Sequence, residues 1–357
     1  MRWVGQSTTT TSEPGPQEAL LPLSGLVRTV RTPEFAGITF HEVLAKSVLN
    51  RVPGNSSMPF HWTINPYRGC SHACVYCFAR KTHSYLNLDT GLDFDSQLVV
   101  KTNAGEVVRR EVLRRSWQRE HVAMGTNTDP YQRAEGRYRL MPAIIGALAD
   151  SGTPFSILTK GTLLARDIPL LKTASAAVQI GMGISLAIID PVLAHAVEPG
   201  TPTPKARLEL ISRLRDAGLP CDVLAMPILP WLTDNDESMD ALFGALAAAG
   251  ATGVSAGALH LRPGAREWYM DWLAAHHPAL VGRYQRLYRG GSYASKEYRT
   301  WLSGRIRHHR ANHGFTSGAQ FFRELEPGVP HDDGAPAAAS SSPASPLPAA
   351  GAEQTLF

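Results

Sequence analysis

Three of the four cysteines in this chain fall within one short segment. The stretch Asn65–Arg80 reads NPYRGCSHACVYCFAR, and it holds Cys70, Cys74 and Cys77 with three and then two residues between them. Thiols this close together cannot serve as a disulfide framework, and such clusters are typical of metal sites. A [4Fe–4S] cluster held by only three thiolates keeps one iron open to another ligand. The spacing therefore predicts an iron–sulfur cluster whose open iron binds a substrate or a cofactor.

Structural zinc is the alternative for the same thiols, with His72 or His83 as the fourth ligand. Zinc modules usually place two C-x2-C pairs far apart along the chain, and this sequence has no second pair. The remaining thiol, Cys221, opens a later apolar run. We expect it to be a buried packing residue at the opposite end of the fold from the site.

Six short apolar runs alternate with segments of helical length. The runs are 61–65, 121–126, 155–159, 179–187, 221–229 and 253–261. Apolar residues at helical spacing predict helices over 104–118, 138–151, 163–173, 204–218 and 238–250. Strands that alternate with helices form a parallel sheet covered by helices. We expect an α/β fold, a partial (β/α)6 TIM-like barrel with its site at the carboxyl ends of the strands. A doubly wound open sheet is the alternative.

The composition indicates one catalytic domain between two tails. With 43% hydrophobic and 18% charged residues, the chain can bury a full core. Residues 1–20 and 326–357 are rich in proline and small residues, and we expect both to be disordered. Between them we expect an N-terminal extension (21–59), the core (60–282) and a basic, aromatic helical segment (283–325).

The N-terminus lacks the apolar run of a secretory signal, and no uninterrupted stretch of about 18 apolar residues occurs. We therefore expect no membrane association. Clustered thiols suit a reducing compartment, which predicts a cytoplasmic location. The formal net charge of +4 is too small to indicate a nucleic-acid partner by itself.

With these features the chain resembles the radical S-adenosylmethionine (SAM) superfamily. The C-x3-C-x2-C loop after the first strand, with the aromatic Tyr76 just before the last cysteine, carries the resemblance. In that superfamily three cysteines hold a [4Fe–4S] cluster, and SAM chelates the fourth iron through its amino and carboxylate groups. An electron from the cluster cleaves SAM to a 5′-deoxyadenosyl radical, which abstracts hydrogen from a substrate. The resemblance implies the same cofactors here, and a reductant such as a flavodoxin or a ferredoxin.

Four segments resemble the branch that contains spore photoproduct lyase, a DNA-repair enzyme. They are NPYRGCSHACVYCFAR (65–80), GTNTDPYQRAE (125–135), LTKGTLLARD (158–167) and EPGTPTPKARLELISRLRDAG (198–218). The resemblance implies contacts to SAM at the strand ends. Acceptors for the methionine amine would be Thr126, Asn127, Thr128 and Asp129. Lys160 would pair with the methionine carboxylate, Ser185 with the same group or the ribose, and Tyr76 would lie near the adenine.

One position departs from the lyase branch. In the lyase a cysteine just after the second strand returns a hydrogen atom to the product radical, and Thr126 stands at the matching position here. The O–H bond of threonine is too strong to give up hydrogen to a carbon radical. This difference speaks against literal photoproduct repair and leaves the substrate open.

The stretch from Arg283 to His313 mixes cations with aromatic rings. The cations are Arg283, Arg286, Arg289, Lys296, Arg299, Arg305, Arg307 and Arg310, and the rings are Tyr284, Tyr288, Tyr293, Tyr298 and Trp301. Phosphate-pairing cations and stacking rings make up nucleic-acid surfaces, so we expect a DNA or RNA partner for Arg283–Arg310. Helices that close the barrel, with the rings in the core and the arginines in solvent, are the alternative.

Three functions stay open at this point. The first is a radical SAM enzyme, lyase-like or modifying, that acts on nucleic acid. The second is the same chemistry on a peptide or small metabolite, and the third is a non-catalytic metal-binding module. The last residues, EQTLF, resemble the sliding-clamp-binding peptides of bacterial DNA-repair proteins. A clamp partner would suit the first function.

Overall fold

The structure is a computed structural model of the chain, and it describes residues 25–53, 58–316 and 318–321. The predicted N-terminal lead (1–20) and C-terminal tail (326–357), including EQTLF, lie outside the described residues. Within them, no helix is both long enough and apolar enough to span a membrane.

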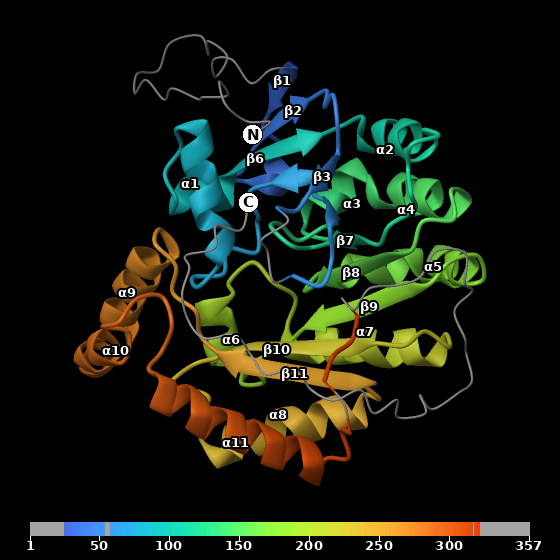
Figure 1. The fold of residues 1–357 in the computed structure, drawn as a ribbon. Coiled ribbons are helices and arrows are strands. Elements are labelled where there is room, and N and C mark those ends of the chain that lie inside the picture. Colours follow the sequence, from blue (N-terminus) through green and yellow to red (C-terminus); the bar gives the residue numbers. More distant parts are fainter. Residues whose placement is uncertain (1–24, 54–57, 317, 322–357) are drawn as a thin grey trace.

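The main sheet has the strand order β11-β10-β9-β8-β7-β4-β3 (Figure 1). Six of these strands run parallel and follow one another along the chain: β4 (Trp62–Ile64), β7 (Val122–Met124), β8 (Phe155–Thr159), β9 (Ile180–Ser185), β10 (Asp222–Ile228) and β11 (Gly253–Ala258). The short β3 (Leu49–Arg51) adds antiparallel to β4 at one edge. The six predicted strands and their parallel order are therefore confirmed, in a sheet whose two ends are not joined.

Helices connect the strands and pack on the outside of the sheet (Figure 1). Five overlap the predicted segments, although the helix predicted over 104–118 ends at Val112 and the one predicted over 163–173 begins as a 3-10 helix: α2 (Ala104–Val112), α4 (Met141–Asp150), α5 (Ile168–Ser175), α7 (Pro204–Asp216) and α8 (Asp236–Ala248). The last two are followed by Gly218 and Gly250, each with a φ of 81°. This left-handed conformation is the one that glycine adopts at low cost just past a helix.

A second sheet supports the first near its N-terminal strands. Its order is β1 (Leu26–Val30), β2 (Thr39–Val43), β6 (Gln97–Lys101) and β5 (Tyr67–Arg68). The sequence analysis did not predict it. The three central residues of β6 are all buried, and so short an apolar run has no periodicity that separates a strand from a helix. Because β5 leads directly into the cysteine segment, this sheet helps to position that segment.

The remaining elements complete the described fold. They are α1 (Leu92–Ser96), α3 (Ala134–Tyr138), α6 (Pro191–Val197), α9 (Ala265–His276), α10 (Val281–Leu287), α11 (Lys296–Asn312) and the 3-10 helices η1 (Pro33–Phe35), η2 (Phe78–Leu86), η3 (Thr162–Asp167) and η4 (Pro278–Leu280). Phe321 lies against Gly183 of β9, and Gln320 N donates to Asp222 at the start of β10 (2.5 Å). The segment after α11 therefore covers the amino ends of the strands, which leaves chemistry to the carboxyl ends.

Candidate active site

The clustered cysteines lie in the loop between β5 and η2. Cys70 and Cys74 are buried and Cys77 is half-buried, and all three are free thiols. Burial raises the pKa of Cys77 to about 11, and Cys70 adds to the shift. Burial and the Glu198 carboxylate raise the pKa of Cys74, to which Cys77 and Cys70 also contribute. Thiols that repel one another as thiolates need a cationic partner, and the irons of a cluster supply one. The donor set therefore fits the cluster predicted from the sequence.

A buried arginine fixes the cysteine loop from behind. Arg80 is fully buried, and its Nε and Nη2 donate to the carbonyl oxygen of Cys74 at 3.2 and 3.0 Å. Its Nη1 donates to Gly91 O (2.8 Å), and Asp95 balances its charge at 2.9 Å. Sequence analysis missed this role, although Arg80 ends the quoted cysteine motif. Its position three residues past the last ligand was the only signal.

The loop is also clamped on either side of Cys70. The Gln132 side chain donates to Gly69 O (3.0 Å) and accepts from Ser71 N (2.9 Å). From the other side, Gly200 N donates to His72 O (3.0 Å). A Cβ on Gly200 would lie only 2.0 Å from Ser71 O, so this approach requires glycine. Both Gln132 and Gly200 lie in the quoted motifs, and neither was predicted to act on the cysteine loop.

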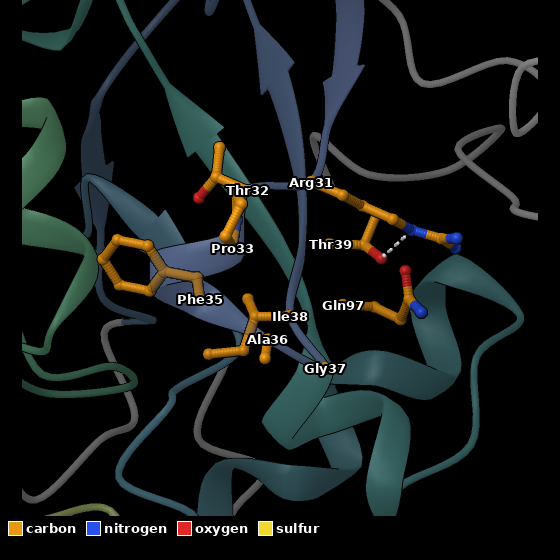
Figure 2. Close-up of a pocket in the computed structure, with 9 residues that line it drawn as sticks. All are labelled: Arg31, Thr32, Pro33, Phe35, Ala36, Gly37, Ile38, Thr39 and Gln97. Carbon is orange, nitrogen blue, oxygen red and sulfur yellow. Dashed lines mark hydrogen bonds between the residues drawn. The ribbon is translucent and has the colours of Figure 1, made fainter.

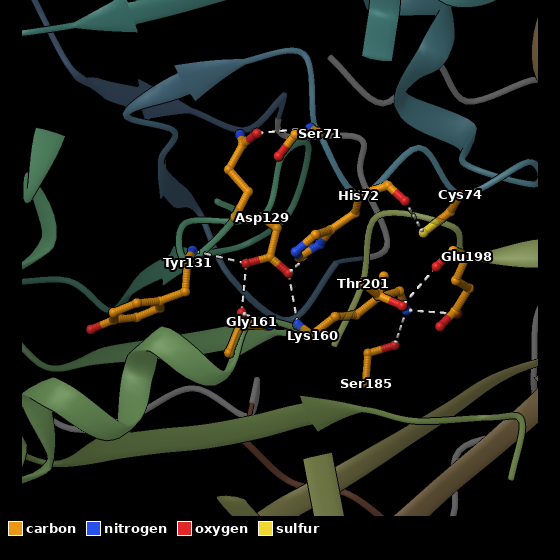
Figure 3. A network of polar contacts seen from close by, with 12 residues as sticks. Ser71, His72, Cys74, Asp129, Tyr131, Lys160, Gly161, Ser185, Glu198 and Thr201 are labelled. Carbon is orange, nitrogen blue, oxygen red and sulfur yellow. Dashed lines mark hydrogen bonds and ion pairs between the residues drawn. The ribbon is translucent and has the colours of Figure 1, made fainter. Parts of the chain in front are cut away.

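Asp129 joins the end of β8 to the cysteine loop (Figure 3). Its Oδ1 accepts from Tyr131 N (2.8 Å) and Thr159 Oγ1 (2.5 Å). Its Oδ2 accepts from Lys160 N (2.6 Å) and lies 3.3 Å from His72 Nδ1. Both oxygens are thus occupied by protein donors, which leaves little capacity for a ligand. The geometry makes Asp129 a positioning residue.

A second polar group, drawn in Figure 3 except for Tyr76 and Arg207, centres on the buried Glu198. Lys160 Nζ hydrogen-bonds Ser185 Oγ and lies 3.4 Å from Glu198 Oε1, while Arg207 Nη2 lies 2.8 Å from Oε2. The Tyr76 hydroxyl also donates to Glu198. Burial raises the pKa of Glu198, but the positive charges of Lys160 and Arg207 outweigh this effect and lower the pKa to about 2. The structure thus brings together three residues that were predicted separately, around a carboxylate that was not predicted.

The residues that follow β7 differ in how their polar groups are used. Thr128 Oγ1 donates to Tyr67 O (3.1 Å), and Asn127 N donates to Asn65 Oδ1 (3.3 Å). The Thr126 hydroxyl is buried and has no hydrogen-bond partner among the described residues. A buried polar group without a partner is unfavourable, and a polar ligand at this place would satisfy it.

Other charged residues of the motifs form a network behind the site. Glu135 is fully buried and accepts from Tyr67 Oη (2.5 Å) and from Arg166 (2.9 Å). Asp167 accepts from Tyr131 Oη (3.0 Å) and also pairs with Arg166. These contacts connect β5, η3 and the loop after β7, so part of each motif serves to hold the strand ends in place.

The C-terminal basic segment divides into a buried and an exposed part. Tyr284 and Tyr288 are buried and donate to the backbone oxygens of Pro230 and Leu259. For these two rings the structure agrees with the alternative in which the segment closes the barrel and its rings lie in the core. Two other rings, Tyr293 and Trp301, are 59% and 46% exposed. The exposed cations of the segment are Arg283, Arg286, Arg289, Lys296, Arg299 and Arg307.

Cys221 and a pocket in the second sheet lie apart from this group. Cys221 is fully buried in the main core at the start of β10, as expected for a packing residue. A pocket of about 550 Å³ lies in the second sheet and is lined by Arg31, Thr32, Pro33, Phe35, Ala36, Gly37, Ile38, Thr39 and Gln97 (Figure 2). Its lining contains no thiol and no polar residue from the carboxyl ends of the main-sheet strands. The candidate site is therefore defined by its side chains and not by this pocket.

The chain is similar to one protein family and to several known proteins. Residues 64–243 match the model of the Radical SAM superfamily. The chain is 58% identical over 308 residues to an uncharacterized protein of Mycobacterium tuberculosis (strain ATCC 25618 / H37Rv), which covers 86% of this chain and 91% of that protein. It is 28% identical over 195 residues to an uncharacterized protein of Methanocaldococcus jannaschii, covering 54% and 69% of the two chains.

Solved structures of spore photoproduct lyase share the fold. The lyase complexed with dinucleoside spore photoproduct aligns with a TM-score of 0.57 at 14% identity, covering 79% of this chain and 82% of that one. A mutant of the lyase with bound AdoMet and dinucleoside spore photoproduct aligns with a TM-score of 0.56 at 14% identity, covering 75% and 78%. At this identity the likeness establishes the fold alone.

Proposed function

This chain belongs to the radical SAM superfamily, and on that premise we propose that Cys70, Cys74 and Cys77 hold a [4Fe–4S] cluster whose open iron binds SAM. When reduced, such a cluster supplies the electron that cleaves SAM to methionine and a 5′-deoxyadenosyl radical, which then abstracts hydrogen from a substrate. The observation that carries the proposal is the set of three free thiols in one loop. Hydrogen bonds from Arg80 and Gln132 hold the backbone of this loop at Cys74 and next to Cys70.

The polar group at the strand ends supports a SAM site next to that loop. In our proposal Lys160 and Ser185 receive the methionine carboxylate, because an ammonium and a hydroxyl are suitable donors to it. Glu198 orients Lys160 from the other side at 3.4 Å. Thr126, whose hydroxyl has no partner among the described residues, accepts from the methionine amine together with Asn127. Thr128 and Asp129 then support the site without contacting SAM, since their side chains hydrogen-bond to other groups of the protein.

Tyr76 belongs to the same proposed site. The ring of Tyr76 lies 5.8 Å from Lys160 Nζ, measured to the ring centroid, and its hydroxyl is bound to Glu198. We propose that this fixed ring packs near the adenine, as the family resemblance implies. A ring held at its hydroxyl offers an apolar face at little cost in conformational entropy.

The fate of the substrate radical distinguishes this chain from a thiol-dependent lyase. Thr126 cannot return a hydrogen atom, and Cys221 is buried at the amino end of β10. We therefore propose that no thiol of this chain other than the cluster ligands takes part in the reaction. Repair of spore photoproduct by return of hydrogen from a protein cysteine does not fit this arrangement.

Nucleic acid is the substrate class that we propose. Support comes from the exposed rings and exposed cations of the segment 283–307, because cations pair with phosphates and rings stack on bases. A flavodoxin or ferredoxin as reductant, a cytoplasmic location and a sliding clamp as partner of EQTLF complete the proposal. A peptide or metabolite substrate is the second candidate, favoured by the burial of Tyr284 and Tyr288.

Anaerobic reconstitution with iron and sulfide tests the cluster. We expect a brown protein with about four irons per chain. Replacing Cys70, Cys74 or Cys77 by Ala should abolish iron retention, and Cys221→Ala should leave it unchanged. A colourless protein that retains zinc on the three cysteines would overturn the proposal in favour of a non-catalytic metal-binding module.

A further inference from the structure

We propose that α8 and α11 together bind a divalent transition-metal ion through Asp240, His309 and His313, at a site separate from the cysteine loop. The two helices pack against each other (Figure 1). One ligand atom from each of the three residues can be chosen so that all lie within 4.8 Å of one another. His309 and His313 lie beyond residues 64–243, which match the superfamily model, and Asp240 lies close to the end of that match.

Helical spacing brings these side chains to one place. His309 and His313 are four residues apart on and just past α11, and Asp236 and Asp240 are four residues apart on α8, so each pair lies on one helical face. His313 Nε2 lies 2.8 Å and His309 Nδ1 lies 3.8 Å from Asp240 Oδ1. Ligand atoms about 2.0–2.2 Å from a tetrahedral zinc ion are separated by about 3.3–3.6 Å. Small side-chain adjustments therefore suffice to bind an ion.

The imidazole of His309 is the observation that points to a ligand. His309 is 4% exposed, and its Nδ1 has no hydrogen-bond partner among the described residues. At 3.8 Å the separation from Asp240 is too long for a hydrogen bond. A buried ring nitrogen left in this way calls for a partner, and a metal ion between Nδ1 and the Asp240 carboxylate would provide one.

The other nitrogen of His309 is held as metal-binding histidines are held. His309 Nε2 lies 3.1 Å from Asp236 Oδ1, and the same oxygen pairs with Arg305 at 2.6 Å. A carboxylate that accepts from Nε2–H fixes the tautomer in which Nδ1 carries no proton. That tautomer is the one able to bind a metal ion through Nδ1.

The surroundings let His313 approach α8 closely and indicate the class of ion. Gly244 follows Asp240 by one turn on α8, and a Cβ there would lie 3.2 Å from His313 Cε1. Asp240 is exposed, so water can complete the coordination. Two imidazoles and one carboxylate suit zinc, cobalt, nickel or copper better than magnesium or calcium. Bound there, the ion would tie α11, which packs on β11, to α8.

Zinc X-ray absorption on the full-length, cluster-loaded protein with one equivalent of Zn²⁺ tests the assignment. We expect only nitrogen and oxygen neighbours at about 2.0–2.2 Å, with the outer scattering of imidazole. Sulfur neighbours at about 2.3 Å would place the ion in the cysteine loop and overturn the proposal. So would an absence of zinc binding at micromolar concentrations.

Variants give a second readout of the same site. Zinc affinity, measured by competition with a chromogenic chelator, should fall by at least about tenfold in His313→Ala and Asp240→Asn. Asp236→Asn should lower it by roughly 10- to 100-fold, because it removes the group that orients His309. His308→Ala is the matched control, since His308 is exposed and contacts Asn312. Equal affinity in all variants would show that the ion binds elsewhere.

Discussion

At the scale of single residues, the charged groups around the strand ends divide according to whether the protein already satisfies them. Asp129 has four protein donors on its two oxygens and serves to align the loops. Lys160 faces Ser185 and Glu198 with its ammonium group, and three donors on that group allow one more acceptor. The difference is not visible in the sequence, where both residues are polar groups just past a strand.

Lys160 gives the residue-scale prediction. Lys160→Ala should weaken SAM binding by about 10- to 100-fold, as expected for the loss of one charge-assisted hydrogen bond. The cluster content should stay unchanged, because Lys160 is not an iron ligand and Glu198 keeps its pairing with Arg207. Equilibrium dialysis with labelled SAM measures the effect. Lys172→Ala, at an exposed position on α5, is the control. Equal affinity in both variants would contradict the proposed carboxylate contact.

At the scale of elements, the alternation of apolar runs and helical segments was sufficient to predict the six parallel strands. Five of those strands have a neighbouring strand on each side, β11 forms one edge of the sheet, and polar residues or glycines lie near their ends. The second sheet was missed because its strands are defined by tertiary pairing: β6 pairs with β2 across 58 residues of sequence. The clamps on the cysteine loop, Arg80 and Gln132, were missed for a related reason. Their partners are backbone carbonyl and amide groups, which no motif reveals.

A buried histidine links two of the central strands and gives the element-scale prediction. His121, next to β7, contacts Ser156 Oγ of β8 at 2.9 Å, and burial lowers its pKa from 6.5 to about 4. Between these values the unfolded chain binds the proton and the folded protein does not. Its contribution to stability is therefore complete above pH 6.5 and is lost as the pH falls towards 4.

Urea unfolding at several pH values checks this linkage. The free energy of unfolding should fall by about 1–2 kcal/mol between pH 7 and pH 5 through this group alone. His121→Gln should flatten the slope by that amount, while a surface variant such as His308→Gln should not. The slope left in His121→Gln belongs to other buried histidines, such as His83, whose pKa burial also lowers to about 4. An unchanged slope in His121→Gln would contradict the assignment.

At the scale of the whole molecule, cations are exposed along α10 and α11, whereas the segment after α11 closes the amino ends of the strands. If the substrate is nucleic acid, replacing Arg283, Arg286 and Arg289 by Ala should lower the salt dependence of DNA affinity. The expected change is roughly 0.7–0.9 logarithmic units of slope per lost phosphate contact. Fluorescence anisotropy over a salt series measures it.

A matched triple variant controls for the loss of charge. Arg110, Arg114 and Arg115 are exposed at and just past α2, in a different part of the molecule from α10 (Figure 1). Their replacement by Ala should leave the slope nearly unchanged. The same change in slope for both triple variants would show that DNA binding depends only on net charge. That result would favour a peptide or metabolite as substrate.

The most direct test of the central claim is the formation of 5′-deoxyadenosine by the reduced protein in the presence of SAM. Anaerobic wild-type protein with reconstituted cluster should form it, and so should Cys221→Ala. Cys74→Ala should form none, since it lacks a ligand to the cluster. The product is quantified by liquid chromatography and mass spectrometry. A wild-type protein that carries a full complement of iron and sulfide, accepts an electron and still leaves SAM intact would contradict the account.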